Sequence, residues 1–289
     1  MTPLRTAALT TLALVAFASN SLLCRLALKH TSIDAASFTT MRLLSGALVL
    51  CLLTRRLRGL QAGQGNWPSA LALFAYAAAF SFAYVSLPAA TGALLLFGAV
   101  QATMIGYGFW SGERLRPKQL AGLALALGGL VGLLLPGLSA PPLAGSVLML
   151  GAGLAWGIYS LRGKGAGNPT QVTAGNFLRA APVAVALSVM MFVFEGASPA
   201  PVDKAGLGYA VASGALTSGL GYAVWYTALP ALKATTAATV QLSVPVIAAL
   251  GGIVFLGEAV TPRLALASAA ILGGIALVAL GKPGAGDRA

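Results

Sequence analysis

Apolar segments long enough to cross a membrane follow one another along the whole chain, separated by short polar or Gly/Pro-containing breaks. Each can span a hydrocarbon core about 30 Å thick as an α-helix. The apolar runs are continuous rather than alternating, which favours helices over a membrane β-barrel. We therefore predict ten transmembrane helices, at residues 6–29, 35–54, 67–87, 89–110, 117–136, 143–163, 171–195, 204–228, 231–255 and 262–281.

Composition supports the same fold class. The 289 residues are 58% hydrophobic and only 8% charged, whereas soluble domains carry about a quarter charged residues. So few charges cannot cover a soluble surface, and the lipid bilayer is the expected surrounding of an all-α integral membrane protein. Arg5, the apolar run after it and the Ala-Phe-Ala at 16–18 resemble a signal peptide. Apolar character resumes over 22–28, so we assign this stretch to the first span.

The basic residues predict an orientation. A net charge of +12 could suggest a nucleic-acid partner, but the Lys and Arg residues lie mostly in the breaks between apolar segments. Of the 18, 12 fall on the side that holds both termini, 3 fall on the opposite side, and Arg25, Arg42 and Arg179 fall within spans. The positive-inside rule therefore places both termini in the cytoplasm and argues against nucleic acid as a partner.

The chain contains an internal repeat. Arg25 and Arg162 are separated by the same distance in sequence as Arg42 and Arg179, "YVSLP" (84–88) resembles "YTALP" (226–230), and "GERLRP" (112–117) resembles "GEAVTP" (257–262). Residues 1–138 and 139–289 are thus predicted to be two copies of one five-helix unit. Because five is odd, the second copy enters the membrane from the opposite side. Such inverted repeats are a recurrent basis of secondary transporters that work by alternating access.

These features resemble the EamA family of the drug/metabolite transporter superfamily. The resemblance rests on the ten spans in two halves, the Gly-Glu and nearby Pro after the fourth helix of each half, and the Trp-Gly at 156–157. It covers nearly the whole chain, although Ser19-Asn20 stands where the second half has Trp156-Gly157.

The resemblance implies an exporter of small organic solutes, of the type that handles aromatic and neutral amino acids, in the bacterial inner membrane. It also implies a cavity lined by the first, third and fourth helices of each half, with the fifth helices outside. We expect no cofactor and a functional monomer. Exporters of other metabolites or drugs in the same superfamily are the alternative.

Aromatic residues of the third and eighth spans are candidates for this cavity. Tyr76, Phe80 and Tyr84 recur every fourth residue and share a helix face. Phe80 and Tyr84 correspond in the repeat to Tyr222 and Tyr226. We predict that Tyr76, Phe80 and Tyr222 line the cavity and that Tyr84 and Tyr226 gate its two ends. The alternative for the outer pair is an interfacial aromatic belt.

Further residues in the spans complete the predicted lining: Asn20, Gln101, Trp156, Tyr159, Gln241 and Pro245. Hydrocarbon cannot satisfy the three amides, so they face either a cavity or another helix. The two aromatic residues offer apolar surface with a polar end. The proline leaves a backbone carbonyl without its usual helical partner.

Two in-span arginines are candidates for the charge of a substrate. No Asp or Glu occurs mid-span to pair with Arg42 or Arg179, and an intramembrane charge commonly marks a pathway or has a polar partner. A substrate carboxylate is one candidate partner. The alternative is that each side chain extends to the membrane surface, which is also how we interpret Arg25.

Other function classes fit less well. The single histidine, His30, lies at a membrane edge, and no spacing indicates catalytic, metal-ligating or phosphate-binding residues. A solute channel is the remaining alternative of a different class. All six carboxylates are placed at loops or helix ends. We therefore expect facilitated transport driven by the substrate gradient rather than proton coupling.

Overall fold

The structure, a computed structural model, is all-helical in the part of the chain that it describes. The described residues are 2–58, 64–111, 117–137, 140–163, 168–195, 203–228, 231–232, 240–241 and 243–280. No strand occurs among them. The prediction of an all-α fold is confirmed.

Seven helices are long and apolar enough, by length and composition, to cross a membrane. They are α1 (Pro3–His30), α2 (Ala35–Arg58), α3 (Trp67–Tyr84), α4 (Ala89–Trp110), α5 (Pro117–Leu134), α6 (Leu143–Gly163) and α7 (Pro169–Glu195). The rest of the chain forms α8 (Lys204–Ala212), a π-helix η1 (Ser213–Leu220), α9 (Gly221–Ala228), α11 (Ser243–Leu256) and α12 (Pro262–Leu280). The elements α8, η1 and α9 follow one another without a break, so they form one rod over the predicted eighth span.

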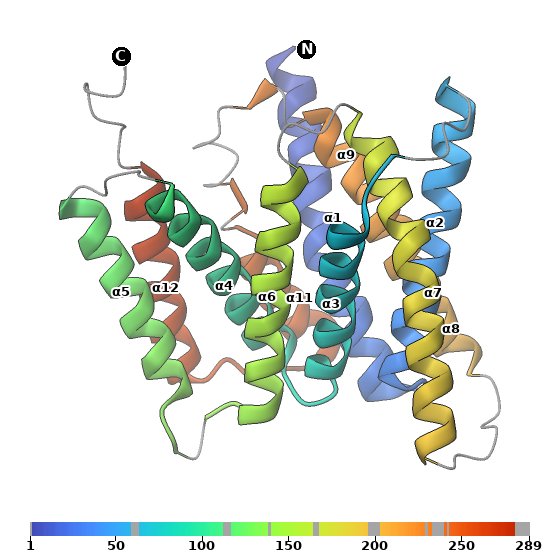
Figure 1. Ribbon diagram of the computed structural model, residues 1–289. Helices are drawn as coiled ribbons and strands as arrows, with labels where there is room; N and C mark the ends of the chain where they lie inside the picture. The colour runs from blue at the N-terminus through green and yellow to red at the C-terminus, as the bar shows by residue number, and fades with distance from the viewer. Residues whose placement is uncertain are drawn as a thin grey trace.

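The rods run alternately up and down the molecule (Figure 1). The start of α1 and the end of α12 lie at one end, at the top of the view. The opposite end holds the ends of α1, α3 and α11 and the starts of α4 and α12; we call it the Glu258 end. As a result, α1 and α6, which begin the two predicted repeats, run in opposite directions (Figure 1).

Local sequence explains several helix starts. Thr2, Asn66 and Asp203 are N-caps whose side chains accept hydrogen bonds from backbone amides of the first turn. Pro117 and Pro262 are the first residues of α5 and α12, where the missing N–H is not needed.

The outer surface is apolar. Large hydrophobic side chains are strongly exposed around the bundle, including Trp110 (90%), Phe194 (82%) and Leu266 (74%). A soluble monomer rarely exposes apolar surface on this scale. Together with the seven spanning helices, this surface identifies an integral membrane protein.

Helix contacts are reciprocal between the two halves of the chain. α3 of the first half packs on α6 of the second, and the α8–η1–α9 rod of the second half packs on α1 of the first. Likewise α4 contacts α6, and α11 contacts α1. The pairs α2–α7 and α5–α12 each join one half to the other.

Two details differ from the sequence-based expectations. Helix α3 ends at Tyr84 rather than 87, and the eighth span contains a π-helical segment. In α5, nothing lies within 4 Å of a Cβ built at Gly128 or Gly132. The close contact of α5 with α12 is made by Gly122 and Gly129 instead.

Candidate functional site

A small cavity lies in the middle of the bundle. Its lining comes from α1, α3, α4, α6, η1, α9 and Gln241, and comprises Phe17, Asn20, Ser21, Tyr76, Phe80, Leu96, Phe97, Trp156, Thr217, Tyr222 and Gln241. Its volume is about 20 Å³. This is room for one water molecule, so the cavity is closed around its lining in this conformation.

A polar cluster forms one wall of the cavity. The Asn20 amide nitrogen donates to the Tyr76 hydroxyl at 3.3 Å, and the Asn20 carbonyl oxygen accepts from Ser213 at 2.6 Å and from Thr217 at 3.2 Å. Both hydroxyls belong to the π-helix η1. Such π-helical insertions are frequent at functional sites. Together these bonds connect α1, α3 and η1.

Arg42 of α2 lies against this wall with 1% of its surface exposed. Its Nε donates to the Ser218 hydroxyl at 3.2 Å and its Nη2 donates to the Tyr76 hydroxyl at 3.0 Å. The guanidinium carbon lies 5.1 Å from the ring centroid of Tyr76 and 4.9 Å from that of Phe80, within the range of a cation–π contact. Its Nη1 is buried without a hydrogen-bond partner. All these contacts are with neutral groups, so the buried positive charge is not neutralised by them.

Aromatic rings form a continuous series through the cavity. Trp156 is at the centre of the series, with ring centroids 4.8 Å from Tyr76, 5.1 Å from Tyr222 and 5.4 Å from Tyr159. From Tyr76 the series continues through Phe80 (5.4 Å) to Tyr84, which is 4.7 Å further. The rings come from α3, α6 and α9, and therefore from both predicted repeats.

Most of the predicted lining residues are brought together, but not all. Asn20, Tyr76, Phe80, Trp156, Tyr222 and Gln241 line the cavity. Tyr159 contacts it through Trp156, and its hydroxyl accepts from Asn176 at 3.5 Å. Gln101 is buried in α4, one turn beyond the lining residue Phe97, and Pro245 lies buried in the first turn of α11; neither is part of the lining.

The two in-span arginines have different surroundings. Arg42 does not itself line the cavity but contacts the lining residues Tyr76 and Phe80, whereas Arg179 lies apart from it. The Nη1 of Arg179 donates to the backbone carbonyls of Gln64 at 3.0 Å and Gly175 at 2.9 Å. This places Arg179 where α7 meets the residues just before α3.

The predicted gating tyrosines also differ. Tyr84 is fully buried, its hydroxyl donates to the Ala89 carbonyl at 3.3 Å, and its ring lies between Phe80 and the start of α4. Tyr226 is only partly buried and packs against the core at the opposite end. The first copy of the repeated ending, 112–116, lies outside the described residues.

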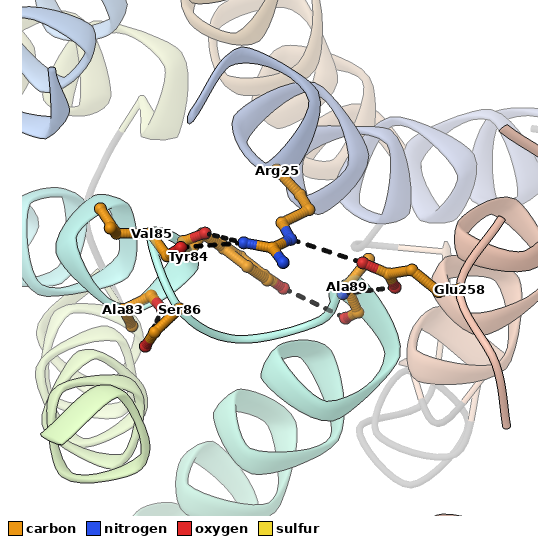
Figure 2. Close-up of polar contacts among 7 residues, drawn as sticks. All are labelled: Arg25, Ala83, Tyr84, Val85, Ser86, Ala89 and Glu258. Atoms are coloured by element: carbon orange, nitrogen blue, oxygen red, sulfur yellow. Dashed lines mark hydrogen bonds and ion pairs between the residues drawn. The ribbon is translucent and has the colours of Figure 1, made fainter. Parts of the chain in front are cut away.

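One polar group that the sequence reasoning missed lies at the Glu258 end. Arg25 donates from Nε to Glu258 Oε1 at 3.4 Å (Figure 2). One sequence signal was available: Arg25 and Arg162 have the same spacing as Arg42 and Arg179. This spacing marks Arg25 as a position of the predicted repeat, but it does not indicate that Glu258 is its partner. Within the described residues, no group of three or more His, Cys, Asp or Glu side chains could hold a metal ion.

Comparisons with known proteins agree with this architecture. The model of the EamA-like transporter family matches residues 143–280. The uncharacterized protein PA1977 of Pseudomonas aeruginosa is 59% identical over 275 residues, which cover 95% of this chain and 94% of that protein. The chain belongs to the EamA-like transporter family. The resemblance inferred from the sequence is thereby confirmed.

Named relatives of this EamA-like transporter are exporters. The threonine/homoserine exporter RhtA of Escherichia coli is 35% identical over 169 residues, 54% of this chain and 53% of the exporter, so the match spans about half of each. A probable terminal-alkyne amino-acid exporter of Streptantibioticus cattleyicolor is 27% identical over 211 residues, 72% of this chain and 70% of that protein. A crystal structure of a protein aligns with a TM-score of 0.64 at 23% identity, covering 96% of this chain and 98% of the other. That likeness concerns the fold.

Proposed function

We propose that this EamA-like transporter exports amino acids, aromatic or neutral ones foremost, across the bacterial inner membrane by alternating access. The observation that carries the proposal is Arg42. A guanidinium buried in the membrane without a neutralising partner is unfavourable. The Nη2 of Arg42 bonds to the cavity-lining Tyr76, and its Nη1 has no hydrogen-bond acceptor. A substrate carboxylate would supply both the missing charge and the missing acceptor.

The aromatic lining supports the same substrate class. Tyr76, Trp156 and Tyr222 offer flat apolar surface with polar ends, which suits uncharged and aromatic side chains. The relatives named as a threonine/homoserine exporter and a probable terminal-alkyne amino-acid exporter also favour amino acids.

The two halves, 1–138 and 139–289, are proposed to be the units that rock against each other. The opposite directions of α1 and α6 (Figure 1) and the reciprocal helix contacts support an inverted repeat. A functional monomer remains part of the proposal. Cytoplasmic termini remain the orientation favoured by the basic residues.

Exchange in proteoliposomes tests the function. Purified protein is assayed for counterflow of a panel of labelled amino acids, with the matching amino-acid amides, which lack the carboxylate, as competitors. We expect exchange of at least one amino acid and weak competition by its amide. Absence of exchange for the whole panel, or equal competition by the amides, would contradict the proposal.

Substitution of Arg42 tests the carboxylate contact. A hydrogen bond to a charged group contributes about 1.5–3 kcal/mol, so Arg42→Gln should raise the half-saturating amino-acid concentration about tenfold or more. The matched control is Arg179→Gln, because Arg179 bonds to backbone carbonyls away from the cavity. An equal loss in both variants at normal membrane levels would count against Arg42.

A further inference from the structure

Four separate parts of the chain meet at the Glu258 end through two charged side chains (Figure 2). Arg25, near the end of α1, donates from Nη1 to the backbone carbonyls of Tyr84 at 2.8 Å and Val85 at 3.0 Å, and from Nε to Glu258 at 3.4 Å. Glu258, in the connection from α11 to α12, accepts from the Ala89 amide at 2.8 Å. The group therefore joins α1, the end of α3, the start of α4 and the α11–α12 connection.

Each charge also complements a helix end. The carbonyls of Tyr84 and Val85 lie where α3 ends and intrahelical partners run out, at the negative pole of that helix. The Ala89 amide is the first of α4, at its positive pole. The cation thus lies on the C-terminus of α3, the anion lies on the N-terminus of α4, and the two bond to each other. Swapping the two charges would place both on the wrong poles.

The repeated Gly-Glu explains how Glu258 reaches this position. Gly257 has φ +62°, a left-handed conformation that favours glycine, and nothing lies within 4 Å of a Cβ built there. The Glu258 amide donates to the Gly252 carbonyl at 3.0 Å, six residues back in the last turns of α11. Gly257 therefore turns the chain back at the end of α11, and Glu258 points across to α4.

This group lies directly below the cavity. On α1, Arg25 is about one turn from the lining residue Ser21, and on α3, Tyr84 is one turn from Phe80. The Tyr84 ring packs so closely on α4 that a Cβ at Gly92 would lie 2.4 Å from it. The cavity is thus shut at this end by the Tyr84 ring, and behind that ring by the Arg25–Glu258 pair.

We infer that the Arg25–Glu258 pair is a latch that holds this end closed and must break and reform in each transport cycle; this rests on the proposed alternating-access function. Arg25 belongs to the first half of the chain and Glu258 to the second, so separation of the halves here breaks the pair and its bond to Ala89. It is the only ion pair within the described residues. Glu258 also lines a cavity of about 240 Å³, and the side chains of Arg25 and Glu258 are only 12% and 9% exposed. Removing one partner of a largely buried pair leaves the other charge uncompensated, so either single substitution should weaken the closure of this end.

Labelling of Cys24 tests the latch without any substrate. Cys24 is fully buried and directly precedes Arg25. With Cys51→Ser, it is the only cysteine of the chain. In nanodiscs, we expect Arg25→Gln and Glu258→Gln to raise the rate at which a small maleimide labels Cys24 about tenfold, because the opened conformer becomes more populated.

Arg263→Gln is the matched control for this assay. Arg263 lies in the first turn of α12 at the same end, but its guanidinium donates to the carbonyls of Gly132 and Leu135 in and just after α5, and not to the latch. Labelling should stay at the parent rate in this variant. An unchanged rate in Glu258→Gln, or an equal rise in Arg263→Gln, would overturn the inference.

Cross-linking distinguishes an ion pair that opens in each transport cycle from one that stays closed. Arg25→Cys and Glu258→Cys are combined with Cys24→Ser and Cys51→Ser, and joined by a short bifunctional methanethiosulfonate that a reductant removes. We expect amino-acid counterflow to stop on cross-linking and return on reduction, while a monofunctional reagent leaves exchange active. Full exchange by the cross-linked protein would mean that the pair never opens. If the parent protein exchanges no solute, the proposed function fails, and the Cys24 result still decides whether this end is latched.

Discussion

Trp156 is the residue through which the two halves share the aromatic lining. Its ring contacts Tyr76 from the first half and Tyr222 from the second, both at about 5 Å between centroids. Such ring contacts contribute about 0.5–1.5 kcal/mol each beyond burial. We expect Trp156→Ala to lower the initial rate of amino-acid counterflow about tenfold, with Trp156→Phe retaining most of it, as measured in proteoliposomes.

Trp110 is the matched control for Trp156. It lies at the end of α4 with 90% of its surface exposed on the outside of the bundle, so Trp110→Ala should leave the counterflow rate within twofold of the parent. Expression and membrane insertion are measured for both variants. A normal rate in Trp156→Ala at normal membrane levels would contradict a role in the cavity.

At the residue scale, the sequence was enough to predict which residues lie in or near the cavity, but not all of the contacts that they make. Arg42 and Arg179 occupy equivalent places in the predicted repeat, yet Arg42 bonds to the cavity-lining Tyr76 and Arg179 bonds to backbone carbonyls near α3. The partner of Arg42 on η1, Ser218, is 176 positions away in the chain, and Glu258 is 233 positions from Arg25. Periodicity within one helix cannot identify such partners, because it depends only on neighbours three or four residues apart.

At the element scale, the close contact of α2 with η1 requires a glycine, which has no side chain, on η1. A Cβ at Gly214 would lie 2.0 Å from the Arg42 carbonyl oxygen, so Gly214→Ala must push the two helices apart. Overpacking of this kind costs about 1–3 kcal/mol. We expect a lower apparent Tm for Gly214→Ala in detergent, together with weaker counterflow because Arg42 is displaced.

Gly208 of the same rod provides the control. No atom lies within 4 Å of a Cβ at Gly208, and alanine is the better helix former. Gly208→Ala should therefore leave the apparent Tm unchanged or raise it slightly. Equal Tm values for the two variants would show that the α2–η1 contact tolerates a methyl group.

The start of α8 carries a pH-dependent cap. Asp203 accepts hydrogen bonds from the amides of Gly206, Ser32 and Ala205, and these bonds lower the pKa of its carboxyl from the ordinary value of 3.8. Because the folded-state pKa is lowered, the cap stabilises the protein fully above about pH 4 and loses this effect as pH falls through the lower value. Asp203→Ala should lower the apparent Tm by a few degrees at pH 7, and the difference from the parent should shrink below pH 3.8. A difference that stays constant with pH would exclude the charged cap.

Element boundaries were largely predictable, because prolines, N-caps and apolar runs are local signals. The predicted spans 89–110, 143–163 and 204–228 match the observed helices or rods. The π-helix η1 was not predicted, since "SGALTSGL" reads locally as an ordinary weak helix. The wider turn of η1 brings Ser213, Thr217 and Ser218 toward Asn20 and Arg42. The packing of α1 and α2 against η1 makes the π-helix favourable, and that packing is not a local signal.

At the scale of the whole molecule, the described carboxylates lie away from the cavity. Asp34 and Asp203 cap helices and Glu258 lies at the Glu258 end; the side chains of Glu113, Glu195 and Asp287 are outside the described residues. Proton coupling by side-chain titration needs a group that titrates in the accessible pH range and meets both sides. We therefore expect counterflow to persist without any imposed pH or ion gradient. Accumulation of substrate driven by a pH gradient alone would reveal a coupled proton path.

The proposed repeat is a feature of the whole molecule that can be predicted from a single sequence, because it appears when the chain is compared with itself. The closed state of the cavity could not be predicted in this way. Its volume of about 20 Å³ depends on how α1, α3, α4 and α6 pack across the bundle. A second conformation of the same chain would have the same residues and the same helix boundaries, so local sequence patterns cannot distinguish the two.

The fixed charge of Arg42 has an electrical consequence. The guanidinium stays protonated, and over a complete cycle it returns to its starting position, so only the charge of the solute itself crosses the membrane. A neutral amino acid carries one carboxylate and one ammonium group and hence no net charge. The membrane potential, which acts with about 2.3 kcal/mol per charge per 100 mV, then exerts no net force on the transported species. The concentration ratio of such a solute alone would set the direction of flow, in energised and de-energised membranes alike.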